Sequence, residues 1–103
     1  DVAASFQKAV TDVLVDHAMH AVKEFGFKKL AIAGGVASNS ALRAAMQEAC
    51  DKNGVEFYHP SPILCTDNAA MIGAQAYYEY LAGNVADMNL NAYATKSILG
   101  ETI

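Results

Sequence analysis

Residues 30–39 read LAIAGGVASN. The apolar run predicts a short strand over residues 29–33, and the paired Gly34 and Gly35 predict a sharp turn after it. Ser38 and Asn39 are residue types that commonly cap the start of a helix. At such a strand–glycine–helix junction, backbone amides with no partner inside a helix can bind an anion or a nucleotide. A plain turn is the alternative interpretation of the two glycines. Asn39 has the same two interpretations, a helix cap or an amide directed at a ribose or phosphate.

A second landmark is the stretch CTDNAAM over residues 65–71. It places the carboxylate of Asp67 at the predicted start of an apolar helix. A carboxylate there either caps the helix or favours its positive end. It is also an oxygen ligand suited to Fe²⁺, Zn²⁺ or Mg²⁺. Because one carboxylate cannot form a metal site, the cap is the better interpretation from this stretch alone.

Apolar spacing predicts three helices, over residues 3–25, 38–53 and 66–82, ended by Gly26, Gly54 and Gly83. A second strand is predicted over residues 55–58, and prolines after it predict an extended loop that excludes helix. The third helix is apolar almost all round, so we expect it to be packed on most sides. The predicted inward face of the first helix is Phe6, Val10, Val13, Leu14, His17, Ala21 and Phe25. In the second helix, Leu42, Ala45, Met46 and Ala49 should face inward, and Arg43, Gln47, Glu48 and Lys52 outward.

The resulting order α-β-α-β-α predicts an α/β fold with two parallel strands joined by a right-handed crossover. Two strands make a small sheet for a complete α/β domain, and the chain has no initiator Met. We therefore expect residues 1–103 to be one subdomain of a longer protein. Its ordered core should span about residues 3–83, followed by a tail over residues 84–103.

Composition excludes several classes of protein. A hydrophobic fraction of 53% argues against disorder. The net charge of −4 and the scattered basic residues argue against a chain that grips nucleic acid by itself. The opening residues carry no signal-peptide pattern, and the longest apolar run is too short to span a bilayer, so we expect a cytoplasmic protein without a membrane segment. Cys50 and Cys65 are expected to be free, buried thiols.

The remaining side chains with possible chemistry have simpler interpretations. His17 and His20 lie three residues apart and can in principle share a metal, but a core histidine beside an interfacial one fits their positions better. His59 has no evident partner. Tyr77, Tyr78 and Tyr80 occupy more than one side of the third helix, which favours packing or an interface. No P-loop, HExxH motif or nucleophile–base pair is present.

Taken together, residues 33–43 (AGGVASNSALR) and 64–72 (LCTDNAAMI) resemble the C-terminal part of the tRNA threonylcarbamoyladenosine transferase family, TsaD. This family was long labelled a glycoprotease or O-sialoglycoprotein endopeptidase. The resemblance covers roughly residues 5–90. It implies part of the second RNase H-like half of an actin/Hsp70/sugar-kinase (ASKHA) fold.

By this resemblance, Gly34 and Gly35 belong to the adenosine-binding motif and Asn39 binds the adenylate substrate. Asp67 corresponds to the family's metal-binding aspartate. The metal, iron or zinc, would take its two histidine ligands from an N-terminal half absent here. The implied reaction moves a threonylcarbamoyl group from threonylcarbamoyl-adenylate to tRNA, so no catalytic residue is expected within this chain and it should be inactive alone.

The resemblance also implies partners, namely an inactive paralogue and a small P-loop ATPase. The tail departs from the family by lacking an Arg-Pro-Arg-Trp ending. Loss of a neighbouring half should expose apolar surface and favour self-association. Two alternatives stay open at this point: part of another actin-like ATPase, such as a sugar or acetate kinase, and a dimerisation module without catalysis.

Overall fold

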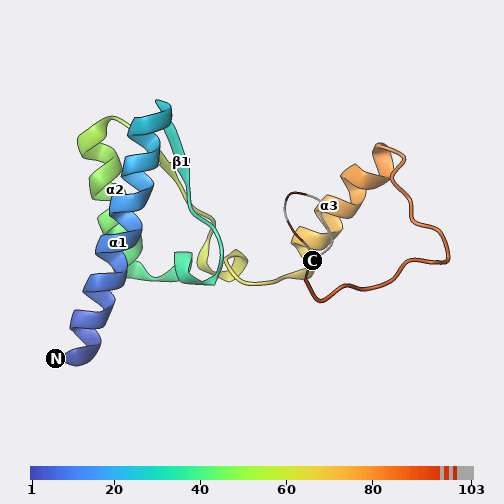
Figure 1. Cartoon of the computed structure of the whole chain (residues 1–103), viewed down its shortest axis with the longest axis horizontal. Coiled ribbons are helices and arrows are strands. Elements are labelled where there is room, and N and C mark those ends of the chain that lie inside the picture. Colours follow the sequence, from blue (N-terminus) through green and yellow to red (C-terminus); the bar gives the residue numbers. More distant parts are fainter. Residues whose placement is uncertain (96, 98, 100–103) are drawn as a thin grey trace. The chain divides into compact units, whose positions relative to one another are not determined.

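The computed structural model describes residues 1–95, 97 and 99, so part of the predicted tail (residues 96, 98 and 100–103) lies outside the described residues. The contacts between residues cluster into two compact units, Asp1–Asn68 and Ala69–Ile103. Each unit is described by itself. The first contains two helices and the sheet, and the second contains the third helix (Figure 1).

Helix α1 spans Val2–Phe25. The Asp1 carboxylate accepts a hydrogen bond from the Ala4 amide at 3.1 Å, which caps the helix start. Gly26 ends the helix in the left-handed region, at φ 70°, and its amide donates to the Val22 carbonyl. The predicted helix and its glycine stop are therefore confirmed.

Helix α2 spans Ser40–Asn53 and lies beside the C-terminal half of α1, while the first turns of α1 extend past it (Figure 1). The contact forms the core of this unit, which consists of Met19, Val22, Leu42, Met46, Cys50 and Val55. Leu42 and Met46 were predicted to face inward and do so.

The predicted inward face of α1 is wrong. Phe6 is 71% exposed, Val13 53% and Phe25 66%. The helix instead packs through Val15, Ala18, Met19 and Val22, which lie on an adjacent side of the helix. The physical reason is that α1 carries two apolar faces, and the sequence periodicity detects the more strongly apolar one rather than the one that α2 covers.

Strands β1 (Lys29–Ala31) and β2 (Glu56–Tyr58) pair in parallel, with Leu30 opposite Phe57. The pairing is extended at both ends, where the Glu56 amide donates to the Lys28 carbonyl and the Ile32 amide donates to the Tyr58 carbonyl. The α/β class and the parallel pairing of the two strands are confirmed. Both strands are shorter than predicted.

Two short 3₁₀ turns connect these elements. One, Gly35–Ser38, follows β1, so α2 begins at Ser40 rather than at residue 38. The other, Pro62–Leu64, lies where the prolines were predicted to exclude helix. That prediction is wrong for this single turn, because a proline at its first position has no amide that needs a partner inside the turn.

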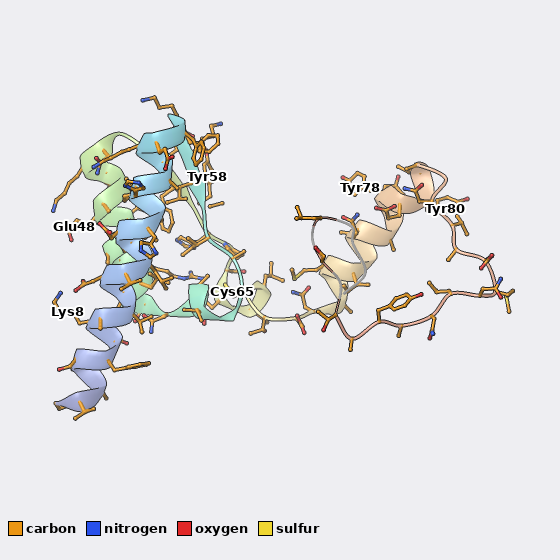
Figure 2. All side chains as sticks on the ribbon, in the orientation of Figure 1. Lys8, Glu48, Tyr58, Cys65, Tyr78 and Tyr80 are labelled. Carbon is orange, nitrogen blue, oxygen red and sulfur yellow. The ribbon has the colours of Figure 1, made fainter. Side chains whose placement is uncertain are left out.

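In the second unit, helix α3 spans Ala69–Leu81 and is followed by Gly83 at φ 78°. It is shorter than the predicted helix over residues 66–82. None of its residues is buried, so the prediction of packing on most sides is also wrong. Tyr78 and Tyr80 project from the helix as exposed side chains (Figure 2). The rings of Tyr77 and Tyr78 meet edge to face, 5.7 Å apart.

Cys50 and Cys65 are both buried and free, as predicted. Among the described residues, α1 to α3 include no helix with the length and apolar character to cross a membrane.

Candidate functional site

The segment after β1, which we call the glycine turn (residues 34–39), has the backbone that its sequence predicts. Gly34 adopts φ 90° and ψ 170°, a conformation open essentially to glycine alone. The turn then closes on itself, because the Ala37 amide donates to the Gly34 carbonyl and the Ser38 hydroxyl donates to the Gly35 carbonyl at 2.7 Å. Gly34 and Gly35 are both exposed. The first amides of the turn therefore lie at the surface, where a ligand can reach them.

Asn39 caps α2. Its side-chain oxygen accepts a hydrogen bond from the Leu42 amide at 3.0 Å. Its amide nitrogen donates to the side-chain oxygen of Gln7 in α1 at 3.2 Å. The capping interpretation is thus what the structure shows. A ligand that used the Asn39 amide nitrogen would take the place of Gln7, an exposed side chain.

Asp67 lies in the second segment of the site, which we call the aspartate loop (residues 59–68). Its carboxylate is exposed, and α3 begins two residues later, at Ala69. The predicted N-cap position is therefore wrong, because Asn68 stands directly before the helix. The second interpretation, a negative charge near the positive end of the helix, is compatible with the position of Asp67.

The glycine turn and the aspartate loop lie against each other. A Cβ atom built on Gly35 would stand 3.9 Å from the Thr66 methyl group, an ordinary van der Waals contact. The two motifs that the sequence separates by about thirty residues are thus adjacent in space, and Asp67 follows directly on the contacting residue.

Arg43 joins the two segments. From the first turn of α2, its Nε donates to the Ala37 carbonyl at 2.5 Å, and one terminal nitrogen lies 3.0 Å from His59 Nδ1. The other terminal nitrogen donates to the Pro60 carbonyl at 2.9 Å and to Cys65 Sγ at 3.1 Å. The predicted outward orientation of Arg43 is wrong, since its side chain is half-buried. His59, for which the sequence offered no partner, is one of its contacts.

Cys65, labelled in Figure 2, is the buried anchor of the aspartate loop, with 3% of its surface exposed. At the end of β2, the Tyr58 hydroxyl donates to the Glu56 carboxylate, which raises the pKa of Tyr58 above its ordinary value.

An apolar groove of about 390 Å³ adjoins the glycine turn, a feature that no motif of the sequence indicated. Leu14 and Ala18 of α1 form one side, and Val36 and Ala37 of the turn form another. Leu30 of β1 and Ile32, directly after the strand, line it as well. Exposed backbone amides and an apolar surface therefore occur side by side.

The histidines do not form a metal site. His17 is exposed rather than in the core, and His20 lies 3.6 Å from Glu24 one turn along α1. Within the described part of the chain, no group of three histidine, cysteine or acidic side chains is arranged to hold a metal ion. A metal at Asp67 would therefore need ligands from beyond these residues.

Comparison with known proteins decides the family. The family model for TsaD, tRNA N6-adenosine threonylcarbamoyltransferase, matches residues 1–74, which contain both the glycine turn and the aspartate loop. The chain belongs to the TsaD family. This assignment favours the transferase over the sugar- or acetate-kinase alternative.

Curated relatives carry the same name. The tRNA N6-adenosine threonylcarbamoyltransferase of Clostridium novyi is 62% identical over 92 residues, and that of Clostridium perfringens is 60% identical over the same length. That of Staphylococcus epidermidis is 56% identical over 91 residues. The matches cover 88–89% of this chain but 27% of each relative. The TsaD chain described here thus spans about a quarter of the length of these relatives.

Proposed function

We propose that this TsaD chain forms part of the acyl-donor site of a tRNA N6-adenosine threonylcarbamoyltransferase. The observation that carries the proposal is the proximity of Gly35 to Thr66, where an added Cβ atom would stand 3.9 Å from the Thr66 methyl group, because it brings together the two motifs of the family inside the matched residues 1–74. In the proposed site, the glycine turn contacts the adenylate part of threonylcarbamoyl-adenylate, and the aspartate loop lies beside it.

The proposed roles of the individual residues are supported by their positions in the glycine turn. Gly34 shapes the turn, and Gly35 lets the ligand approach the backbone. Asn39 directs its amide at the adenylate after releasing Gln7. The apolar groove offers a surface for a flat base next to these polar groups.

Asp67 is proposed as one ligand of a divalent metal, iron or zinc. A hard carboxylate oxygen suits either ion, but the described residues supply too few donors to hold it. The other ligands would come from residues outside this chain. When bound, the metal would act as a Lewis acid on the acyl donor.

The larger assembly is proposed on the same basis. The two parallel strands and their crossover helix would form part of an RNase H-like half of the ASKHA fold. The substrate tRNA would be held elsewhere, because this chain has a net charge of −4. An inactive paralogue and a small P-loop ATPase are the proposed protein partners.

The test is a chimera in which this chain replaces the matched 92 residues of the Clostridium novyi relative. We expect the chimera to transfer threonylcarbamoyl groups to tRNA and to bind metal. Asp67→Ala should lose both transfer and bound metal, whereas Asp16→Ala, at an exposed aspartate of α1, should retain both.

Two results would count against the proposal. An inactive chimera beside an active parent enzyme would show that this segment does not supply the site. Full transfer and full metal content in Asp67→Ala would remove Asp67 from the metal site.

A further inference from the structure

Arg43 is the only arginine of the chain, and its side chain contacts both the glycine turn and the aspartate loop. Its acceptors are the Ala37 carbonyl in the glycine turn, His59 and Pro60 at the start of the aspartate loop, and Cys65, which directly precedes Thr66 and Asp67 in that loop. A guanidinium presents its donors in a rigid planar fork, so these acceptors are held at fixed mutual positions. A flexible ammonium group cannot engage them all in the same geometry.

The nature of the acceptors indicates that Arg43 fixes the position of the glycine turn relative to the aspartate loop, rather than only holding one of them in place. Two of them are backbone carbonyls, one on each of the two segments that meet at Gly35 and Thr66. Cys65 is buried, so its sulfur gives the fork an acceptor shielded from water. The Ala37 carbonyl and the Cys65 sulfur thus both accept hydrogen bonds from the Arg43 guanidinium, which fixes the distance between them.

We propose that Arg43 is a positioning residue that sets the spacing between the glycine turn and the aspartate loop. The inference rests on the proposed function, in which these two segments act on one acyl donor. Displacing one reacting group by about 1 Å can lower a reaction rate about 100-fold. A change in the distance between the two segments would therefore slow threonylcarbamoyl transfer, even though every residue that contacts the acyl donor is still present.

The first test measures the spacing in the chain itself, independently of activity. In wild type, nuclear Overhauser contacts should connect the Gly35 α-protons to the Thr66 methyl group, and the Leu30 and Phe57 backbones to each other. Arg43→Lys should lose the first contact and keep the second. Lys52→Gln, which removes a basic group from the exposed side of the same helix, should keep both.

The second test measures catalysis in the chimera with the Clostridium novyi relative. Arg43→Lys should lower kcat by about 100-fold, with a smaller change in the KM for tRNA. His59→Ala, at an exposed residue, removes a single contact of the fork. It should give an intermediate loss of the Gly35–Thr66 contact and of kcat, and it replaces Arg43→Lys as the deciding variant if that protein does not fold.

The outcomes separate the two proposals. A Gly35–Thr66 contact of full strength in folded Arg43→Lys, or in His59→Ala if Arg43→Lys does not fold, would overturn the positioning role. Loss of the Gly35–Thr66 contact in the same variant with no change in kcat would also overturn the positioning role of Arg43 in catalysis. An inactive wild-type chimera would contradict the proposed function, and the spacing measurement would then decide on Arg43 alone.

Discussion

Gly34 and Gly35 are adjacent, but they depend on glycine for different reasons. Gly34 has a backbone conformation that an alanine adopts only with strain, whereas Gly35 has room for a Cβ atom at ordinary contact distance from Thr66. We expect Gly34→Ala to lower the free energy of unfolding by about 1–3 kcal/mol. Gly35→Ala should leave it unchanged or slightly raised. Urea unfolding of both variants measures the difference.

Gly35→Ala also tests ligand binding separately from stability, when it is introduced into the chimera. Gly35→Ala should raise the KM for threonylcarbamoyl-adenylate by about tenfold, equivalent to about 1.4 kcal/mol, because the methyl group keeps the ligand from the backbone. Gly54→Ala is the control for lost stability, since it strains a positive φ of 64°, which Gly35→Ala does not, and lies far along the chain from the turn. It should cost stability and leave this KM unchanged. An unchanged KM in Gly35→Ala would contradict the close approach.

Cys50 links stability to alkaline pH. Burial, assisted by the charge of Asp51, raises the pKa of its thiol above the ordinary value of 9.0. In the unfolded chain the thiol therefore loses its proton at lower pH than in the folded chain, so the folded state binds more protons in this window. The free energy of unfolding should fall as pH rises above about 9. Urea unfolding at pH 8 and pH 9.5 measures the effect.

Cys50→Ala provides the control for this prediction. Because alanine does not titrate, the variant should show a smaller decrease between the two pH values, whatever its stability at pH 8. An equal decrease in both proteins would assign the effect to other groups, such as Tyr58, whose pKa is also raised.

At the scale of elements, local chemistry was enough to predict much of the fold. Capping residues, terminal glycines and apolar spacing located α1, α2 and both strands, and the length of the crossover required parallel pairing. The packing face of α1 could not be predicted, because both of its faces are apolar and only the position of α2 distinguishes them. The lack of burial along α3 has the same origin, since composition does not say what lies beside a helix.

The site shows a similar division. Gly34, Gly35 and Asn39 were recognised from their residue types, and the structure places them at one turn. The role of Arg43 was missed, because a polar residue on a helix is normally solvated and its acceptors lie sixteen or more residues away in the sequence, apart from Ala37. The sequence feature that singles out this residue is that Arg43 is the sole arginine of the chain.

At the scale of the whole molecule, the face of α1 that carries Phe6 and Val13 is apolar, and none of the described residues buries it. We expect the chain to associate with a second copy of itself through Phe6 and Val13, which are 71% and 53% exposed. Light scattering at increasing concentration should show a rising mass. The double variant Phe6→Glu/Val13→Glu should stay monomeric, whereas Met88→Glu, at a fully exposed methionine outside α1, should not. A monomeric wild type at every concentration would contradict this expectation.

The sheet of two strands has a further consequence. Among the described residues each strand pairs on one side only, so its other edge offers unsatisfied backbone donors and acceptors to any extended peptide. Lys29 and Glu56, 3.9 Å apart, place charge at the amino ends of both edges and discourage such addition there. Ala31 and Tyr58 carry no charge at the opposite ends. A strand from another chain would therefore begin to form backbone hydrogen bonds at the carboxyl ends of β1 and β2, where the chain leads directly into the glycine turn and the aspartate loop.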